Sequence, residues 1–64
     1  MRYLVFHIVI NGEKRTMWFE SQKAAIKWGE YVLRDDKARS LLMTDENNNI
    51  YFDVDKDAVP AGAA

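Results

Sequence analysis

Few residues in this 64-residue chain are of types that could perform acid–base, nucleophilic or redox chemistry. It has one histidine, His7, and no cysteine. The four Ser and Thr residues fall in predicted strands, a helix cap or turns, with no evident base nearby. His7 lies in the middle of an apolar run, where a histidine is more often a packed or surface aromatic than a general base. We therefore expect no enzymatic activity, no cofactor and no small-molecule substrate.

Carboxylates are more numerous, and their spacing bears on metal binding. Asp53 and Asp55 share one face of a predicted strand and could bind a cation, although an acidic strand end in solvent is a commoner arrangement. The calcium-loop pattern D-x-[DN]-x-[DN]-G-x5-E begins at Asp45. It fails, because Ile50 replaces the required glycine and Lys56 replaces the bidentate glutamate. The sequence therefore predicts no metal site.

Length and composition limit what can hold these residues in place. A chain of 64 residues forms one domain at most and buries only about 60% of its unfolded surface. Its 48% hydrophobic content and its eight aromatic residues (two Trp, three Tyr, three Phe) are too high for a disordered segment. Without disulfides, stability must come from packing or from association with another chain.

The first half of the chain predicts a hairpin and a helix. Residues 3–10 (YLVFHIVI) have the β-branched and aromatic content of a strand. The Asn11-Gly12 pair that follows favours a type I′ turn, and the return strand is expected at residues 14–20. Ser21 is a suitable N-cap for a helix that runs from Gln22 to about Arg34.

Gly29 lies at the centre of the apolar face of this predicted helix. Glycine inside a helix costs about 1 kcal/mol relative to alanine. We expect the helix backbone to approach the sheet closely at this position, which would explain a residue without a side chain.

Two further strands are predicted in the second half, at residues 39–44 and 50–55, joined by a loop of turn-forming residues. A short second helix starting near Asp36 remains an alternative for residues 37–43. The predicted fold class is a single ββαββ α+β domain, in which one helix packs on one face of a four-stranded, mainly antiparallel sheet. The strand order 2-1-3-4 is favoured because the most apolar strand should be central. Residues 1–56 form this domain, and residues 57–64 are expected to be a flexible tail.

A single helix covers only one face of such a sheet. The side chains assigned to the helix side are Leu4, Phe6, Ile8, Ile10, Met17, Phe19, Leu41, Met43, Ile50, Phe52 and Val54. The residues assigned to the other face, and predicted to bind a partner, are Tyr3, Val5, His7, Val9, Trp18, Leu42, Tyr51, Asp53 and Asp55. The register of the second strand is uncertain, because a shift by one residue would exchange Trp18 for Met17 and Phe19.

A contiguous exposed apolar patch usually marks an interaction site. The sequence therefore predicts a non-enzymatic protein-binding module that acts as an inhibitor or adaptor of a larger assembly, or as a homodimer. By analogy of size and architecture, phage-encoded proteins that block a host machine belong to this class. If a partner buries His7, its protonation at mildly acidic pH should weaken the association.

Single-stranded nucleic acid is the alternative ligand, because Tyr3, Trp18 and Tyr51 could stack on bases. Charge disfavours it. Residues 1–34 carry a net charge of +3 and residues 35–64 one of −4, and Asp53 and Asp55 share the proposed face. The longest apolar run, of eight residues, is shorter than the roughly 20 that span a bilayer, and no signal peptide is evident. We expect a cytoplasmic protein, in the host cytoplasm if it is phage-encoded.

Overall fold

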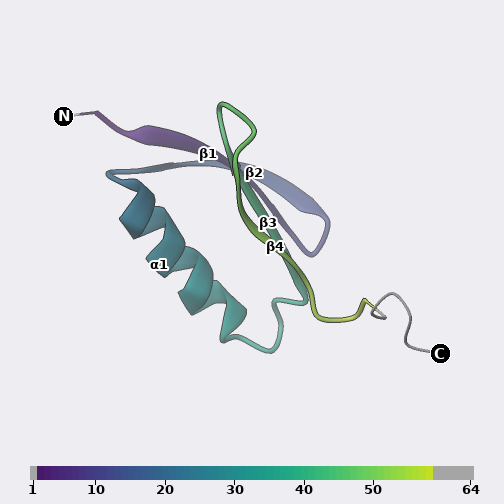
Figure 1. The fold of residues 1–64 in the computed structure, drawn as a ribbon. Coiled ribbons are helices and arrows are strands. Elements are labelled where there is room, and N and C mark those ends of the chain that lie inside the picture. Colours follow the sequence, from purple (N-terminus) through teal and green to yellow (C-terminus); the bar gives the residue numbers. More distant parts are fainter. Residues whose placement is uncertain (1, 59–64) are drawn as a thin grey trace.

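The computed structural model describes residues 2–58 and has the predicted ββαββ order. Its elements are β1 (Leu4–Ile10), β2 (Glu13–Phe19), α1 (Gln22–Leu33), β3 (Ser40–Asp45) and β4 (Ile50–Asp55). The four strands form one antiparallel sheet in the order β2-β1-β3-β4, and α1 lies on one side of it (Figure 1). The predicted fold class and strand order are confirmed. Residues 40–43, for which a short helix was the alternative, belong to β3.

The β1–β2 hairpin has the predicted turn and register. Asn11 and Gly12 adopt φ values of 51° and 82°, as a type I′ turn requires. Val5 lies opposite Trp18 and Phe6 lies opposite Met17. Met17 therefore faces the helix side together with the fully buried Phe6, and Trp18 faces away.

Helix α1 begins and packs as its sequence indicates. The Ser21 hydroxyl accepts a hydrogen bond of 3.1 Å from the backbone N–H of Ala24, which caps the first turn. Gly29 is buried, and a Cβ atom placed there would overlap the aromatic ring of Phe52 on β4. The predicted close approach of the helix to the sheet at Gly29 is confirmed, and Phe52 is the side chain that requires it.

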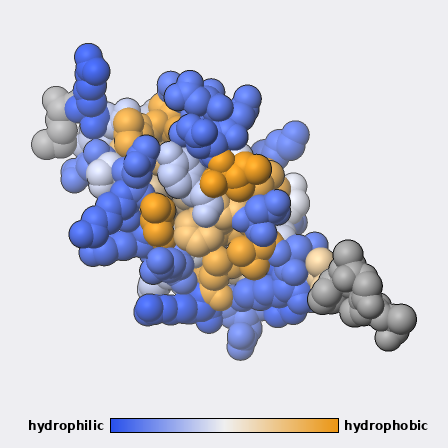
Figure 2. All heavy atoms as spheres, in the orientation of Figure 1, coloured by the Kyte–Doolittle hydropathy of each residue, from blue (hydrophilic) through white to orange (hydrophobic). Residues whose placement is uncertain are grey.

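The core lies between α1 and the sheet. Its fully buried members come from β1, β3 and α1: Phe6, Ile8, Ala25, Leu41 and Met43. The ring of Phe6 meets that of Phe19 edge to face, with 5.6 Å between ring centroids, and Phe19 in turn contacts Trp28 on α1. Figure 2 shows apolar side chains grouped in the middle of this view and hydrophilic ones around them.

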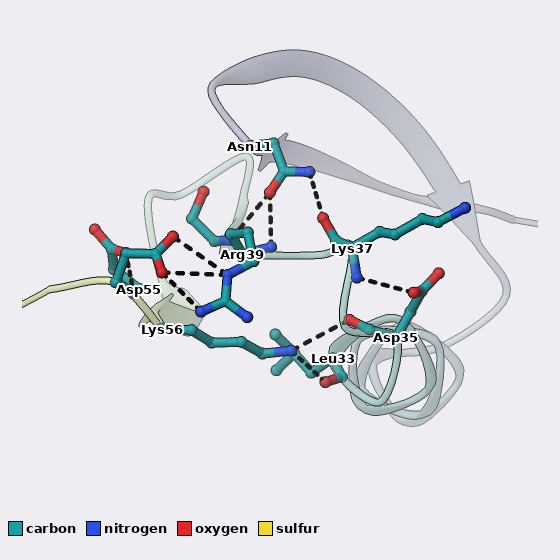
Figure 3. Close-up of polar contacts among 9 residues, drawn as sticks. Asn11, Leu33, Asp35, Lys37, Arg39, Asp55 and Lys56 are labelled. Atoms are coloured by element: carbon teal, nitrogen blue, oxygen red, sulfur yellow. Dashed lines mark hydrogen bonds and ion pairs between the residues drawn. The ribbon is translucent and has the colours of Figure 1, made fainter.

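A polar network joins the hairpin turn to the segment between α1 and β3 (Figure 3). The Asn11 side chain donates to the Lys37 carbonyl (2.9 Å) and accepts from the backbone N–H groups of Arg39 (2.7 Å) and Ser40 (3.2 Å). The backbone N–H of Asn11 also donates to the Ser40 carbonyl. Asn11 therefore does more than turn the chain: it holds the start of β3 against the end of β1.

The chain after β4 closes the same end of the molecule. The Lys56 ammonium donates to the backbone carbonyls of Leu33 (2.7 Å) and Asp35 (3.3 Å), which stabilises the end of α1 (Figure 3). Asp57 pairs with Arg39 at 2.7 Å. The rest of the predicted tail, from residue 59 on, lies outside the described residues.

Candidate protein-binding face

The side of the sheet opposite α1, here called the open face, is set by strand alternation. On β1 the side chains of Phe6 and Ile8 point into the core, so the residues between and beside them point to the other side. Cross-strand pairing extends this side over all four strands. The open face consists of Val5, His7, Val9, Lys14, Thr16, Trp18, Ser40, Leu42, Thr44, Ile50, Asp53 and Asp55.

One row of residues crosses the whole open face. Lys14 on β2 lies opposite Val9 on β1, Val9 lies opposite Leu42 on β3, and Leu42 lies opposite Asp53 on β4. A basic residue therefore stands at one edge of the sheet and an acidic residue at the other, with two aliphatic side chains between them. Asp55 extends the acidic edge and lies opposite Ser40.

A second row runs through the histidine. His7 lies between Thr16 and Thr44, its partners on the two neighbouring strands, and Thr44 lies opposite Ile50. His7 is exposed and flanked by hydroxyl side chains, and no carboxylate lies directly opposite it. The row therefore places hydroxyl groups beside the imidazole but lacks the base–carboxylate pair of a catalytic triad.

The apolar side chains of the open face are accessible to solvent. Trp18 is 61% exposed, Ile50 63% and Leu42 37%, while Val5 and Val9 are half-buried between them. No described helix or strand covers this side of the sheet (Figure 1). Tyr3, which precedes β1, is also exposed, at 53%.

The prediction that Tyr51 lies on the open face is wrong. Its ring meets Phe6 in the core edge to face, with 5.3 Å between centroids, and its hydroxyl donates to Asp45 Oδ2 at 3.0 Å. Ile50, which was assigned to the helix side, lies on the open face instead. The other residues predicted on β1, β2, β3 and β4 lie where expected, namely Val5, His7, Val9, Trp18, Leu42, Asp53 and Asp55.

A β-bulge explains why Tyr51 lies on the helix side and Ile50 on the open face. Met43 pairs with Phe52 and Thr44 pairs with Ile50, so Tyr51 is an extra residue on β4 without a direct partner. Such an insertion breaks the alternation of faces, so Tyr51 and Phe52 both lie on the helix side. Burial, followed by the hydrogen bond to Asp45, raises the pKa of Tyr51.

The loop before β4 is organised around Asp45. Its carboxylate accepts from the side chain and backbone N–H of Asn49 (2.9 and 3.0 Å), from the backbone N–H of Asn47 (2.8 Å) and from Tyr51. These bonds, that from the Asn49 side chain foremost, lower the pKa of Asp45. The sequence of this loop begins like a calcium site, but amide groups of the loop itself hydrogen-bond to the Asp45 carboxylate.

Sequence reasoning missed several members of the open face, among them Lys14 and Ile50. Lys14 was detectable, because it lies two and four residues before Thr16 and Trp18 on the same strand. Ile50 was not detectable, because IYFDVD alternates as an unbroken strand would, and the bulge depends on contacts of Tyr51 with other elements.

Neither a metal-binding cluster nor a membrane-spanning helix is found among residues 2–58. Within this range no group of three or more His, Asp or Glu side chains is placed to hold a metal ion. None of the described helices has the length and apolar character needed to cross a membrane. The chain matches no protein-family model, and comparisons with curated proteins and with solved structures gave no significant match.

Proposed function

We propose that this protein is a non-enzymatic protein-binding module of the cytoplasm, which inhibits or links components of a larger assembly through its open face. The observation that carries this proposal is the exposure of Trp18, Leu42 and Ile50 on the side of the sheet that α1 does not cover. When another protein covers large apolar side chains, their surface is removed from water, and this burial lowers the free energy of the complex.

The composition of the open face agrees with a protein ligand. Val5, Val9 and Leu42 lie on its two central strands beside His7, Ser40 and Thr44, and its charged residues lie on the two edge strands. Protein interfaces likewise combine apolar anchors with charged residues near their rim. Trp18 offers a large apolar ring with one hydrogen-bond donor, which is a frequent anchor of such contacts.

The test replaces two apolar residues of the open face with lysine, in the variant Val5→Lys/Leu42→Lys. Wild-type and variant proteins are immobilised and exposed to an extract of the source organism, and the retained proteins are compared. We expect at least one protein to be retained by the wild type and lost with the variant, because two charges would be desolvated on binding. Circular dichroism verifies that the variant stays folded.

The control variant is Ile26→Lys/Tyr31→Lys, which removes two exposed apolar residues of α1 on the other side of the molecule. It should retain the same proteins as the wild type. Equal retention by all three proteins, or loss with the α1 variant alone, would contradict a role for the open face.

Single-stranded nucleic acid becomes a weaker candidate with Tyr51 in the core. Of the three aromatic residues proposed to stack on bases, Trp18 lies on the open face and Tyr3 only precedes it, while Lys14 is the one basic residue there. Binding to a phosphate backbone requires clustered basic side chains. A filter-binding titration with a single-stranded oligonucleotide at low salt tests this alternative, and retention there would favour nucleic acid.

A further inference from the structure

The open face is complementary to itself, and this property narrows the kind of partner. Lys14 and Asp53 belong to the same cross-strand row but lie on opposite edge strands. Three strand spacings of about 4.8 Å separate them, so they do not pair within one chain. The ion pairs of the described residues, Arg15–Glu13 and Arg39–Asp57, leave both side chains free.

We propose that a second copy of this chain covers the open face, related to the first by a twofold axis parallel to the strands. This inference rests on the proposed function and names the partner. The axis runs between β1 and β3 and reverses the strand order of the second copy. β2 of one copy then lies over β4 of the other, and β1 lies over β3.

This symmetry brings opposite charges together and apolar side chains together. Lys14 faces Asp53 of the second copy, Val9 faces Leu42, and each contact occurs twice. In the next row, Thr16 faces Ile50 and His7 faces Thr44. Sheets pack about 10 Å apart, a gap that a lysine and an aspartate can bridge from opposite sides.

The other twofold axis that stacks two open faces runs across the strands, and charge disfavours it. That axis lays each strand over its own counterpart. The acidic β4, with Asp53 and Asp55, would then face the acidic β4 of the second copy, and Lys14 would have no acidic residue opposite it. Like charges in an interface oppose association, so the axis parallel to the strands is selected.

The size of the face sets the strength of this dimer. Four strands of about six residues cover roughly 20 Å by 20 Å, or about 400 Å² in projection. A standard protein interface buries about 800 Å² of accessible surface per partner. We therefore expect a weak dimer, which sedimentation or light scattering should detect as a mass that rises with concentration between about 1 μM and about 1 mM.

The decisive experiment reverses the two charges separately. Lys14→Glu and Asp53→Lys should each weaken self-association about tenfold or more, because each variant creates two like-charge contacts. A mixture of the two variants should associate as strongly as the wild type. In a mixed dimer the introduced glutamate of one chain faces the introduced lysine of the other, and the unchanged Asp53 faces the unchanged Lys14, so both contacts are attractive again.

The matched control is Arg15→Glu, which reverses a charge on the neighbouring residue of β2 that faces the helix side. It should associate like the wild type. Equal association of the wild type, Lys14→Glu and Arg15→Glu would overturn the proposed symmetry.

A wild-type protein that stays monomeric up to about 1 mM would overturn the second copy as partner. The two proposals fail separately. Retention of foreign proteins by the wild type, and their loss with Val5→Lys/Leu42→Lys, would still support the open face as a binding surface.

Discussion

Phe6 and Ile8 on one side of β1 have no exposed surface, whereas Val5 and Val9 on the other side of the same strand are only half-buried. The residue types hardly differ between these two sides. The difference comes from α1, since twelve residues of helix can cover one face of a four-stranded sheet but not both. In a domain this small, apolar composition alone does not determine burial.

The largest expected effect is a loss of stability that differs between the helix side and the open face. Phe6→Ala removes a fully buried ring, which typically costs about 3–5 kcal/mol. Because domains below about 70–80 residues rarely exceed 3–5 kcal/mol in total, this variant should be largely unfolded at 25 °C. Trp18→Ala removes a larger side chain that is 61% exposed, and should cost less than about 1 kcal/mol.

Circular dichroism without denaturant shows how much of Phe6→Ala is folded, and urea unfolding measures the loss of stability in Trp18→Ala. A loss of stability with Trp18→Ala as large as that with Phe6→Ala would mean that the open face is part of the folding core. That result would remove the contrast between the two faces.

A smaller effect tests how closely α1 approaches the sheet. Gly29→Ala should gain up to about 1 kcal/mol of helix propensity, but its methyl group would overlap Phe52. Overpacking of this kind costs about 1–3 kcal/mol, so we expect a net loss of stability. In the background of Phe52→Val, which removes the ring, the same substitution should be stabilising. Identical effects of Gly29→Ala in both backgrounds would exclude the contact as the reason for the glycine.

The smallest effect concerns the β-bulge, which places Tyr51 on the helix side and Ile50 on the open face. The pKa of Asp45 is lowered in the folded state, so its carboxylate adds stability above the ordinary value of 3.8, and this stability is lost as the pH falls below it. The hydrogen bond from Arg39 lowers the pKa of Asp57 as well, so this carboxylate also adds stability that is lost at low pH. Asp45→Asn should therefore flatten the fall of stability between about pH 5 and pH 2.

Thermal unfolding across this pH range provides the measurement. The control is Asp53→Asn, on the open face, whose carboxylate accepts no hydrogen bond from residues 2–58. It should preserve more of the acid dependence than Asp45→Asn does. If the two variants have the same acid profile, the hydrogen bonds around Asp45 do not order the bulge.

Local patterns were sufficient to predict most of the fold. Asn11-Gly12 indicated the hairpin, Ser21 the start of the helix, and Gly29 a close contact that the structure assigns to Phe52. Such features depend on the conformational preferences of a few neighbouring residues, so a single sequence reveals them. The open face on β1, β2 and β3 followed from alternation in the same way.

The amino-acid sequence by itself determined the ββαββ order and the excess of apolar side chains over what one helix can cover. Only the tertiary structure decided which side Tyr51 and Ile50 occupy, because the bulge follows from the contact of Tyr51 with Phe6 and its hydrogen bond to Asp45. It also decided that Lys14 and Asp53 share one row. That alignment depends on the register of three strand pairs. The Asn11-Gly12 turn sets the register of β1 with β2, but long-range packing sets that of β1 with β3, and the bulge shifts that of β3 with β4.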